Sequence, residues 1–218
     1  MLDLTLGRST SSAIRVLCLG AHSDDIEIGC GGTILTILER YPRVSVDWIV
    51  FGSSEERAIE ARQSAGIFLE GALESTVVVK SYRDGFFPYH GARIKDDFEA
   101  LKSSPSPDLI LTHHRDDRHQ DHRVISDLTW NTFRDHLILE YEIPKYDGDL
   151  GQPNLFVPLE EHICSKKIDT IQKCFLSQRQ KQWFDDLTFM AILRLRGVES
   201  NSPTQYAEAF FSRKALLS

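Results

Sequence analysis

The chain alternates between short apolar runs and longer stretches in which apolar residues recur every three or four positions. Runs such as residues 14–20 and 44–51 lie between polar or glycine-containing segments, which is typical of buried strands. Helical spacing is clear in residues 55–69, where alanines and a leucine fall on one face. The predicted strands are residues 14–20, 44–51, 76–79, 107–112, 137–142 and 206–211, and the predicted helices are residues 31–39, 55–69, 94–101, 120–133, 165–180 and 185–196.

This order of elements predicts an α/β fold. Strands that alternate with helices form a parallel sheet with helices on both faces, joined by right-handed connections. The 218 residues suit a single domain over residues 1–218, with a flexible lead-in over residues 1–12. Residues 144–158 hold three prolines and are predicted to be irregular, either as a substrate loop or as an ordinary surface excursion.

The composition narrows the function classes. A hydrophobic fraction of 41% and a charged fraction of 26% are typical of a globular protein. The net charge of −7 disfavours an extended nucleic-acid-binding face, although a local basic pocket for a phosphorylated substrate remains compatible with it.

The cysteines and the absence of targeting patterns indicate a cytoplasmic protein. The cysteines at 18, 30, 164 and 174 form no C-x-x-C pair, and we expect reduced thiols. The sequence contains no secretory signal pattern and no stretch near the roughly 20 apolar residues that span a bilayer. A lipid substrate would therefore be met at the membrane surface.

Two short polar segments carry the candidate chemistry, and each follows an apolar run. The first contains His22, Asp24 and Asp25, and the second contains His119 and His122. Ligands of open α/β sheets collect at the carboxyl ends of strands, so topology brings these segments together. A catalytic zinc usually keeps three protein ligands and one open position. His22, Asp25 and His122 match that count, and the same set also suits Fe²⁺.

The remaining polar residues of these segments fit catalytic roles. Asp24 adjoins a ligand but points elsewhere, which makes it the natural general base for a metal-bound water. His119 lies one helical turn before His122 and could donate to an oxyanion or protonate a leaving group. Asp121 could keep His119 oriented and protonated. The set predicts a mononuclear metal-dependent amide hydrolase.

Other readings of nearby residues stay open. His113 and His114 are interpreted as strand-end or pocket-wall residues. The glycine cluster at residues 29–32 is interpreted as a tight turn into a helix that starts near Gly31, because a dinucleotide-binding motif would follow the strand directly. A metallo-phosphoesterase would need a second metal, for which Asp116 and Asp117 are the nearest extra acids. A sugar-binding protein without catalysis is the third hypothesis.

The segments at residues 21–33 and 119–122 resemble those of the PIG-L and LmbE family of zinc-dependent N-deacetylases, which act on N-acetylglucosaminyl compounds. The resemblance extends to residues 57–61, 83–85, 196–197 and 206–210, and so covers nearly the whole chain. It implies a Rossmann-like fold, zinc held by His22, Asp25 and His122, and Asp24 as the base. One departure is Ser23, where the family usually has proline; serine can adopt the same φ.

The resemblance also implies an amino-sugar substrate, free, nucleotide-linked or carried on a glycolipid or glycan, from which acetate is released. Arg57 and Asp84 are the expected substrate contacts, with Arg196 as a weaker candidate of the same kind. Their alternative roles are a helix-terminal ion pair and a turn aspartate. The identity of the sugar and the oligomeric state, including a homo-oligomer, stay open.

Overall fold

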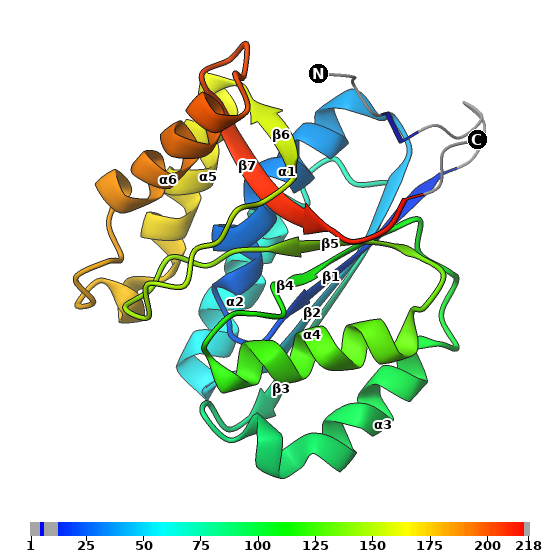
Figure 1. Ribbon diagram of the computed structural model, residues 1–218. Helices are drawn as coiled ribbons and strands as arrows, with labels where there is room; N and C mark the ends of the chain where they lie inside the picture. The colour runs from blue at the N-terminus through cyan, green and yellow to red at the C-terminus, as the bar shows by residue number, and fades with distance from the viewer. Residues whose placement is uncertain (1–4, 7–12, 216–218) are drawn as a thin grey trace.

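Seven strands form one sheet in the computed structural model, which describes residues 5–6 and 13–215 (Figure 1). The spatial order of the strands is β3-β2-β1-β4-β5-β7-β6. The strands are β1 (Ile14–Gly20), β2 (Val44–Gly52), β3 (Glu74–Tyr82), β4 (Leu109–His113), β5 (Leu137–Tyr141), β6 (Leu155–Leu159) and β7 (Tyr206–Ser212). The helices are α1 (Asp25–Arg40), α2 (Glu55–Phe68), α3 (Gly91–Leu101), α4 (Gln120–Thr132), α5 (Glu161–Cys174) and α6 (Asp186–Glu199), with short 3₁₀ turns η1 (Phe87–His90) and η2 (Leu176–Gln178).

The sheet is mostly parallel, which confirms the predicted fold class. Strands β1 to β5 pair in parallel, whereas β7 pairs antiparallel with both β5 and β6. The antiparallel end of the sheet was not predicted. None of the helices in the described part of the chain is both long and apolar enough to cross a bilayer.

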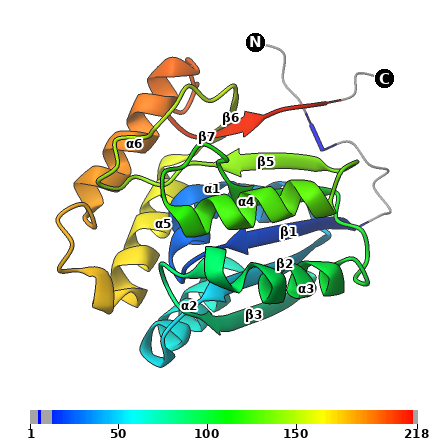
Figure 2. The same cartoon turned by 60° about the horizontal axis from the view of Figure 1, so that its bottom comes forward.

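Helices cover both faces of the sheet (Figure 2). Helices α3 and α4 lie on one face, and α1, α2 and α5 lie on the other. Successive residues of a strand point to opposite faces, and β1 shows this directly: Val16 and Cys18 join the core under α1, whereas Leu17 and Leu19 join the core under α4. Burial on both faces explains why these strands are continuous apolar runs.

Helix α1 corrects one prediction, because it begins at Asp25 and not near Gly31. Asp24 occupies the N-cap position, and the glycine cluster lies inside the helix. Glycine is needed there for close packing: a Cβ at Gly29 would lie 2.2 Å from the ring of Tyr141, and one at Gly32 would lie 2.6 Å from Leu159. Because glycine has a low helix propensity, the sequence pattern predicted the start of this helix too late. The glycines leave room for Tyr141 of β5 and Leu159 of β6 to pack closely against the helix.

Residues 144–158 are not irregular throughout, since β6 begins at Leu155. Pro158 lies opposite Ala207 in the ladder, and β6 is the outermost strand, where a missing N–H is tolerated. Strand β3 is longer than predicted, and α5 begins and ends earlier than predicted. Apart from residues 5 and 6, the predicted flexible lead-in lies outside the described residues.

Candidate active site

The two polar segments meet at the carboxyl ends of β1 and β4. These strands pair in parallel, with Cys18 opposite Leu111. Strand β1 runs into the turn that carries His22 and Asp24, and β4 runs toward the start of α4, where His122 lies. The backbone N–H of Ala21 donates to Nε2 of His113, 2.9 Å away, which fastens the two strand ends together. The sheet therefore brings together residues about a hundred positions apart in sequence, as predicted.

Three donor atoms form a nearly equilateral triangle at this place. Nδ1 of His22 lies 3.3 Å from Oδ2 of Asp25 and 3.2 Å from Nε2 of His122, and the third side, from Nε2 of His122 to Oδ2 of Asp25, measures 3.5 Å. Tetrahedral zinc with ligands at about 2.0–2.2 Å needs donors roughly 3.4 Å apart. The three predicted ligands therefore fit a single tetrahedral ion.

Neighbouring carboxylates fix which ring nitrogens face the triangle. Nδ1 of His122 lies 2.9 Å from Oδ2 of Asp117, so the ring proton sits there and Nε2 keeps its lone pair. Nε2 of His22 lies 3.1 Å from Asp84 and 3.2 Å from Asp121, which leaves the Nδ1 lone pair facing the triangle. Two lone pairs at 3.2 Å repel unless a cation lies between them, and carboxylates in this position orient metal-bound histidines.

The electrostatics of the buried triangle favour a cation. Burial opposes a charge on His22, yet Asp25 together with hydrogen bonds to Asp121 and Asp84 raises the pKa of His22 well above its usual value. A positive charge is therefore favoured at Nδ1, and a bound metal ion would supply it in place of a proton. Burial also opposes ionisation of Asp25, but the rings of His122, His113 and His22 hold the pKa of Asp25 well below its usual range. Burial, followed by the nearby charge of His113, lowers the pKa of His122, which keeps that ring neutral.

The predicted base lies next to the triangle and is held by an arginine. Asp24 is buried, and its Oδ1 accepts a hydrogen bond of 2.6 Å from Nη2 of Arg57. Arg57 stands in the first turn of α2, where the hydroxyl of Ser54 caps the helix. Within the described residues, the Nε of Arg57 is buried without a hydrogen-bond partner.

His119 projects toward the same centre from the N-terminal end of α4. It is the N-cap residue, and its Nδ1 accepts the backbone N–H of Asp121 at 3.3 Å. The neutral ring therefore carries its proton on Nε2. Burial and the nearby charges of His122 and His22 lower the pKa of His119, and its ring centroid lies 4.6 Å from that of His122. A neutral donor beside the triangle is suited to an oxyanion.

A family model described as GlcNAc-PI de-N-acetylase, PIG-L, matches residues 17–133, which contain both polar segments. The chain belongs to the PIG-L family. Among curated proteins it is 25% identical to the uncharacterized deacetylase YaiS of Escherichia coli K12. The alignment runs over 183 residues and covers 79% of this chain and 97% of YaiS.

Solved structures share the fold of this PIG-L family member. The N,N'-diacetylchitobiose deacetylase of Pyrococcus horikoshii aligns with a TM-score of 0.68 and 21% identity, over 93% of this chain and 84% of that one. The 4-carboxy-2-hydroxymuconate hydratase GalB of Pseudomonas putida aligns with a TM-score of 0.70 and 18% identity, over 94% of this chain and 98% of that one. A deacetylase and a hydratase on one fold show that the reaction depends on the site residues.

Asp121 departs from its predicted contact. Its Oδ2 accepts the backbone N–H of Gly85 at 2.6 Å and lies 3.2 Å from Nε2 of His22, and its Oδ1 accepts the N–H of Phe87 at 3.1 Å. The carboxylate thus orients His22 and the turn after β3, and it contacts His119 only through its backbone N–H. The prediction that it orients His119 is corrected, because the 85–87 turn approaches from a distant part of the sequence.

Two of the three predicted substrate-contact residues lie at the site, and the third does not. Asp84 and Arg57 both reach the centre, and the side chain of Asp84 is 65% exposed. Arg196 does not line it: the guanidinium is buried, with Nε and Nη2 on Glu142, Nη1 on Glu199 and a further bond to the carbonyl of Gly151. Since its donors are occupied, we correct Arg196 to an anchor of the segment after β5.

Two contributors were missed from the sequence. His113 was interpreted as a strand-end or pocket-wall residue, and it is indeed the last residue of β4. Its closeness to the site was missed: its Nε2 lies 3.2 Å from Oδ2 of the predicted ligand Asp25, and its ring stacks on that of His122 with centroids 3.9 Å apart. Asp117 was considered only for a second metal, whereas it holds His122. Its position five residues before His122 was a usable signal.

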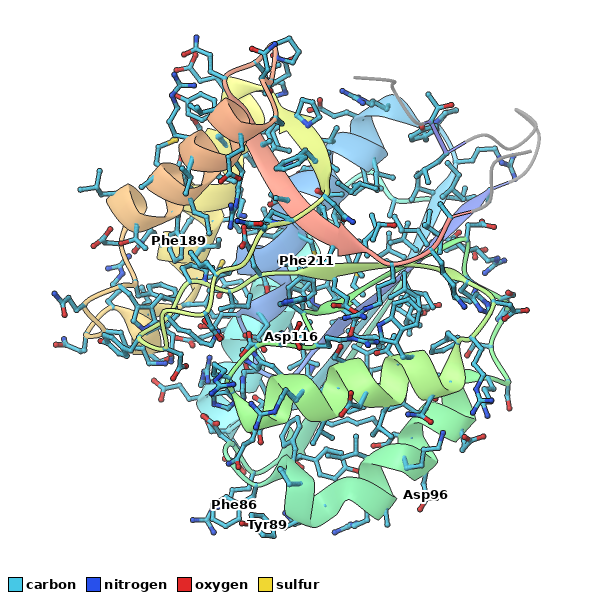
Figure 3. The ribbon with its side chains drawn as sticks, in the orientation of Figure 1. Phe86, Tyr89, Asp96, Asp116, Phe189 and Phe211 are labelled. Carbon is cyan, nitrogen blue, oxygen red and sulfur yellow. The ribbon has the colours of Figure 1, made fainter. Side chains whose placement is uncertain are left out.

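Asp116 and Asp117, the acids considered as ligands of a second metal ion, do not form a second metal site. The side chain of Asp116 is 79% exposed (Figure 3). Oδ2 of Asp117 is shared by Nδ1 of His122 and Nζ of Lys145, at 2.9 Å each. In the described residues, every histidine–carboxylate grouping with metal-ligand spacing includes His22 or His122. The geometry indicates one centre, which disfavours the two-metal phosphoesterase.

Proposed function

We propose that this PIG-L family member is a metal-dependent hydrolase that removes the N-acetyl group from an amino sugar and releases acetate. The observation that carries the proposal is the triangle of His22, Asp25 and His122, with sides of 3.2–3.5 Å. The carboxylate of Asp24 and the imidazole of His119 lie beside this triangle without being part of it. Zinc suits the two nitrogens and one oxygen, and Fe²⁺ suits them as well. When bound, the ion supplies a Lewis acid and a water whose pKa is lowered to about 7.

Asp24 acts as the general base in this mechanism. Arg57 holds Oδ1, and in the described part of the chain no group donates to Oδ2. That oxygen can take the proton of the attacking water and return it to the leaving amine. The salt bridge with Arg57 keeps Asp24 in one orientation while the proton moves.

His119 stabilises the charge that develops on the amide oxygen. Its Nδ1 is occupied by the helix N-terminus, so Nε2–H is the donor available to an oxyanion. Removal of one such donor costs about 10²–10³ in kcat in other hydrolases. Asp84, whose side chain is 65% exposed beside His22, is the contact for sugar hydroxyls, and Arg57, which holds Asp24, is the second substrate contact.

Metal content is the first experiment. Purified protein should hold about one zinc or iron ion per chain, and His122→Ala should lose it. Asp24→Asn should retain the metal while acetate release from N-acetylated sugars falls by about 10²–10⁴. Asp96→Asn, on the exposed face of α3 (Figure 3), is the matched control and should behave as the wild type.

The outcomes separate the proposal from its rivals. Full activity of Asp24→Asn would remove Asp24 from the mechanism. Phosphate release together with two metal ions per chain would favour the phosphoesterase. A bound metal without acetate release from any N-acetylated sugar would favour the sugar-binding protein.

A further inference from the structure

Two hollows lie side by side between β3 and α3. One, of about 410 Å³, lies at the end of β3 and the start of α3, and its lining includes Arg83, His90 and Arg93. The other, of about 240 Å³, is lined mainly by apolar side chains. Lys80 and Asp97 line both hollows, which therefore form a single groove with a basic end and an apolar end.

The basic end of the groove holds two arginines without acidic partners. Within the described residues, neither Arg83 nor Arg93 has a carboxylate within salt-bridge distance, and both are exposed. The guanidinium of Arg83 lies 3.8 Å above the ring of Phe86, which restrains its direction without using its N–H donors. His90 is half-buried beside them. On a chain whose net charge is −7, this local positive charge is suited to a specific anion.

The apolar end of the groove reaches the core under α3. Ile49 and Phe51 of β2 form its inner side and are buried. Val78 and Leu101, both half-buried, line it from β3 and α3, and the exposed Ala100 lies on its outer side. An apolar cavity of about 150 Å³ holds a benzene ring. The hollow of about 240 Å³ therefore holds a somewhat larger apolar body, such as a short alkyl chain or a substituted ring.

The wall that the two hollows share carries no net charge. Nζ of Lys80 lies 2.8 Å from Oδ1 of Asp97, and the hydroxyl of Tyr82 donates to Oδ2 of Asp97 at 2.7 Å. Partial burial together with this bond to Asp97 raises the pKa of Tyr82 to about 12, so the phenol stays protonated. The groove is therefore positive at one end, neutral in the middle and apolar at the other end.

We propose that this groove is a second ligand site, which binds a small organic acid with its carboxylate on Arg83 and Arg93 and its apolar body against Phe51. An inorganic anion would leave the apolar hollow empty, and a neutral hydrocarbon would leave both arginines unpaired. The planar donors of arginine match a carboxylate. A fatty acid and an aromatic acid share this chemistry, and the experiment distinguishes them. The site is independent of the proposed deacetylase function.

The test is calorimetry with four probes on the metal-loaded protein. Octanoate and 4-propylbenzoate have both a carboxylate and an apolar body, 1-octanol has only the body, and acetate has only the carboxylate. The better of the two acids should bind about tenfold or more tightly than 1-octanol and than acetate, since charged hydrogen bonds and buried methylenes each contribute that much. Tighter binding of octanoate identifies an alkyl body, and tighter binding of 4-propylbenzoate identifies an aromatic one.

Two variants assign the binding to the two ends of the groove. Arg83→Ala/Arg93→Ala should weaken the better acid about tenfold or more and leave the affinity for 1-octanol within about twofold. Ala100→Trp obstructs the apolar hollow from its exposed side and should weaken the acid and 1-octanol alike, by about tenfold or more.

Each variant has a control away from the groove. Arg43→Ala removes an exposed arginine just before β2, at the opposite end of the parallel strands. Ala191→Trp adds the same ring at an exposed position of α6. Both controls should bind the acid as the wild type does.

Several results would overturn the second site. They are no binding of either acid, an affinity for the acids no higher than for 1-octanol or acetate, or an affinity that Arg83→Ala/Arg93→Ala and Ala100→Trp leave unchanged. A carboxylate bound at the catalytic centre is recognised separately, because both groove variants would retain it and acetate would share it. Since the readout is binding, a failure of the protein to release acetate from sugars does not alter the conclusion about the groove.

Discussion

Nδ1 of His122 lies 2.9 Å from Oδ2 of Asp117, a buried carboxylate five residues earlier in the chain. Burial alone would raise the pKa of Asp117, but the hydrogen bond from His122, the charge of His113 and the charge of Lys145 lower it below its usual range. The carboxylate therefore stays ionised and holds the ring with Nε2 toward the triangle. A carboxylate behind a metal-bound histidine makes the ring a stronger ligand.

Asp117→Asn should weaken metal binding by about 10–100-fold, because the amide no longer fixes the ring orientation or supplies charge. Competition with a chromophoric chelator measures this affinity directly. The matched control is the neighbouring Asp116→Asn, since the Asp116 side chain is 79% exposed and lies 3.7 Å from His114, its one ion-pair partner among the described residues. Equal affinity in both variants would show that Asp117 has no part in the metal site.

The second prediction concerns Lys145, which ties the segment after β5 to the site. Its Nζ contacts Asp117 at 2.9 Å and Asp149 at 2.6 Å, and the side chain is only 10% exposed. Lys145→Met removes the charge shared by two buried carboxylates and should cost about 3–5 kcal/mol of unfolding free energy. Limited proteolysis should then cleave residues 142–154 faster than in the wild type. The exposed Lys102→Met is the control, and equal cleavage in both variants would contradict the anchoring role.

Much of the site could be predicted from the sequence because backbone topology alone determines it. His22 and His122 each follow a continuous apolar run, and parallel strands deliver their carboxyl ends to one edge. No side-chain detail was needed for that step. The distances between the donor atoms, which decide whether an ion fits, come only from the structure.

The missed features depend on contacts between distant segments. The true start of α1 was concealed because Gly29 and Gly32 oppose helix formation locally, and their reason lies in Tyr141 and Leu159, far along the chain. The orientation of Asp121 depends in the same way on two N–H groups of the 85–87 turn. Local pattern carries no information about such partners.

A buried ion pair gives the third prediction. Lys167 and Glu208 lie 2.6 Å apart with side chains 3% and 2% exposed. Glu208 also accepts the N–H groups of Gly32 and Thr33 in the middle of α1, and Lys167 donates to the carbonyl of Ile28. The pair therefore fastens α5 and β7 to the helix that starts at the active site.

Either single substitution, Lys167→Met or Glu208→Gln, should destabilise the protein by about 3–5 kcal/mol, because each leaves one buried charge without its partner. The double variant should be less destabilised than the sum of the two singles, since no unpaired charge remains. Urea unfolding of the four proteins measures the coupling. Strict additivity would show that the two side chains act independently.

The last prediction uses Glu27, a fully buried carboxyl in the first turn of α1, for whose two oxygens the described residues offer no hydrogen-bond partner. Burial raises the pKa of Glu27 well above its usual value, so the folded state holds the proton more tightly than the unfolded state. Such a group stabilises the fold fully below the unfolded pKa of about 4.3. That stability is lost as the pH rises toward the folded pKa.

Glu27→Gln keeps the shape of the side chain but cannot ionise. In metal-free protein, where metal binding adds no pH dependence, the wild type should therefore lose stability relative to Glu27→Gln as the pH rises from 5 to 8. Thermal unfolding at a series of pH values measures the difference. Glu56→Gln, an exposed position in the first turn of α2, is the control and should follow the wild type. A wild-type stability that stays constant relative to that of Glu27→Gln over this range, or rises, would show that Glu27 is not held protonated by burial.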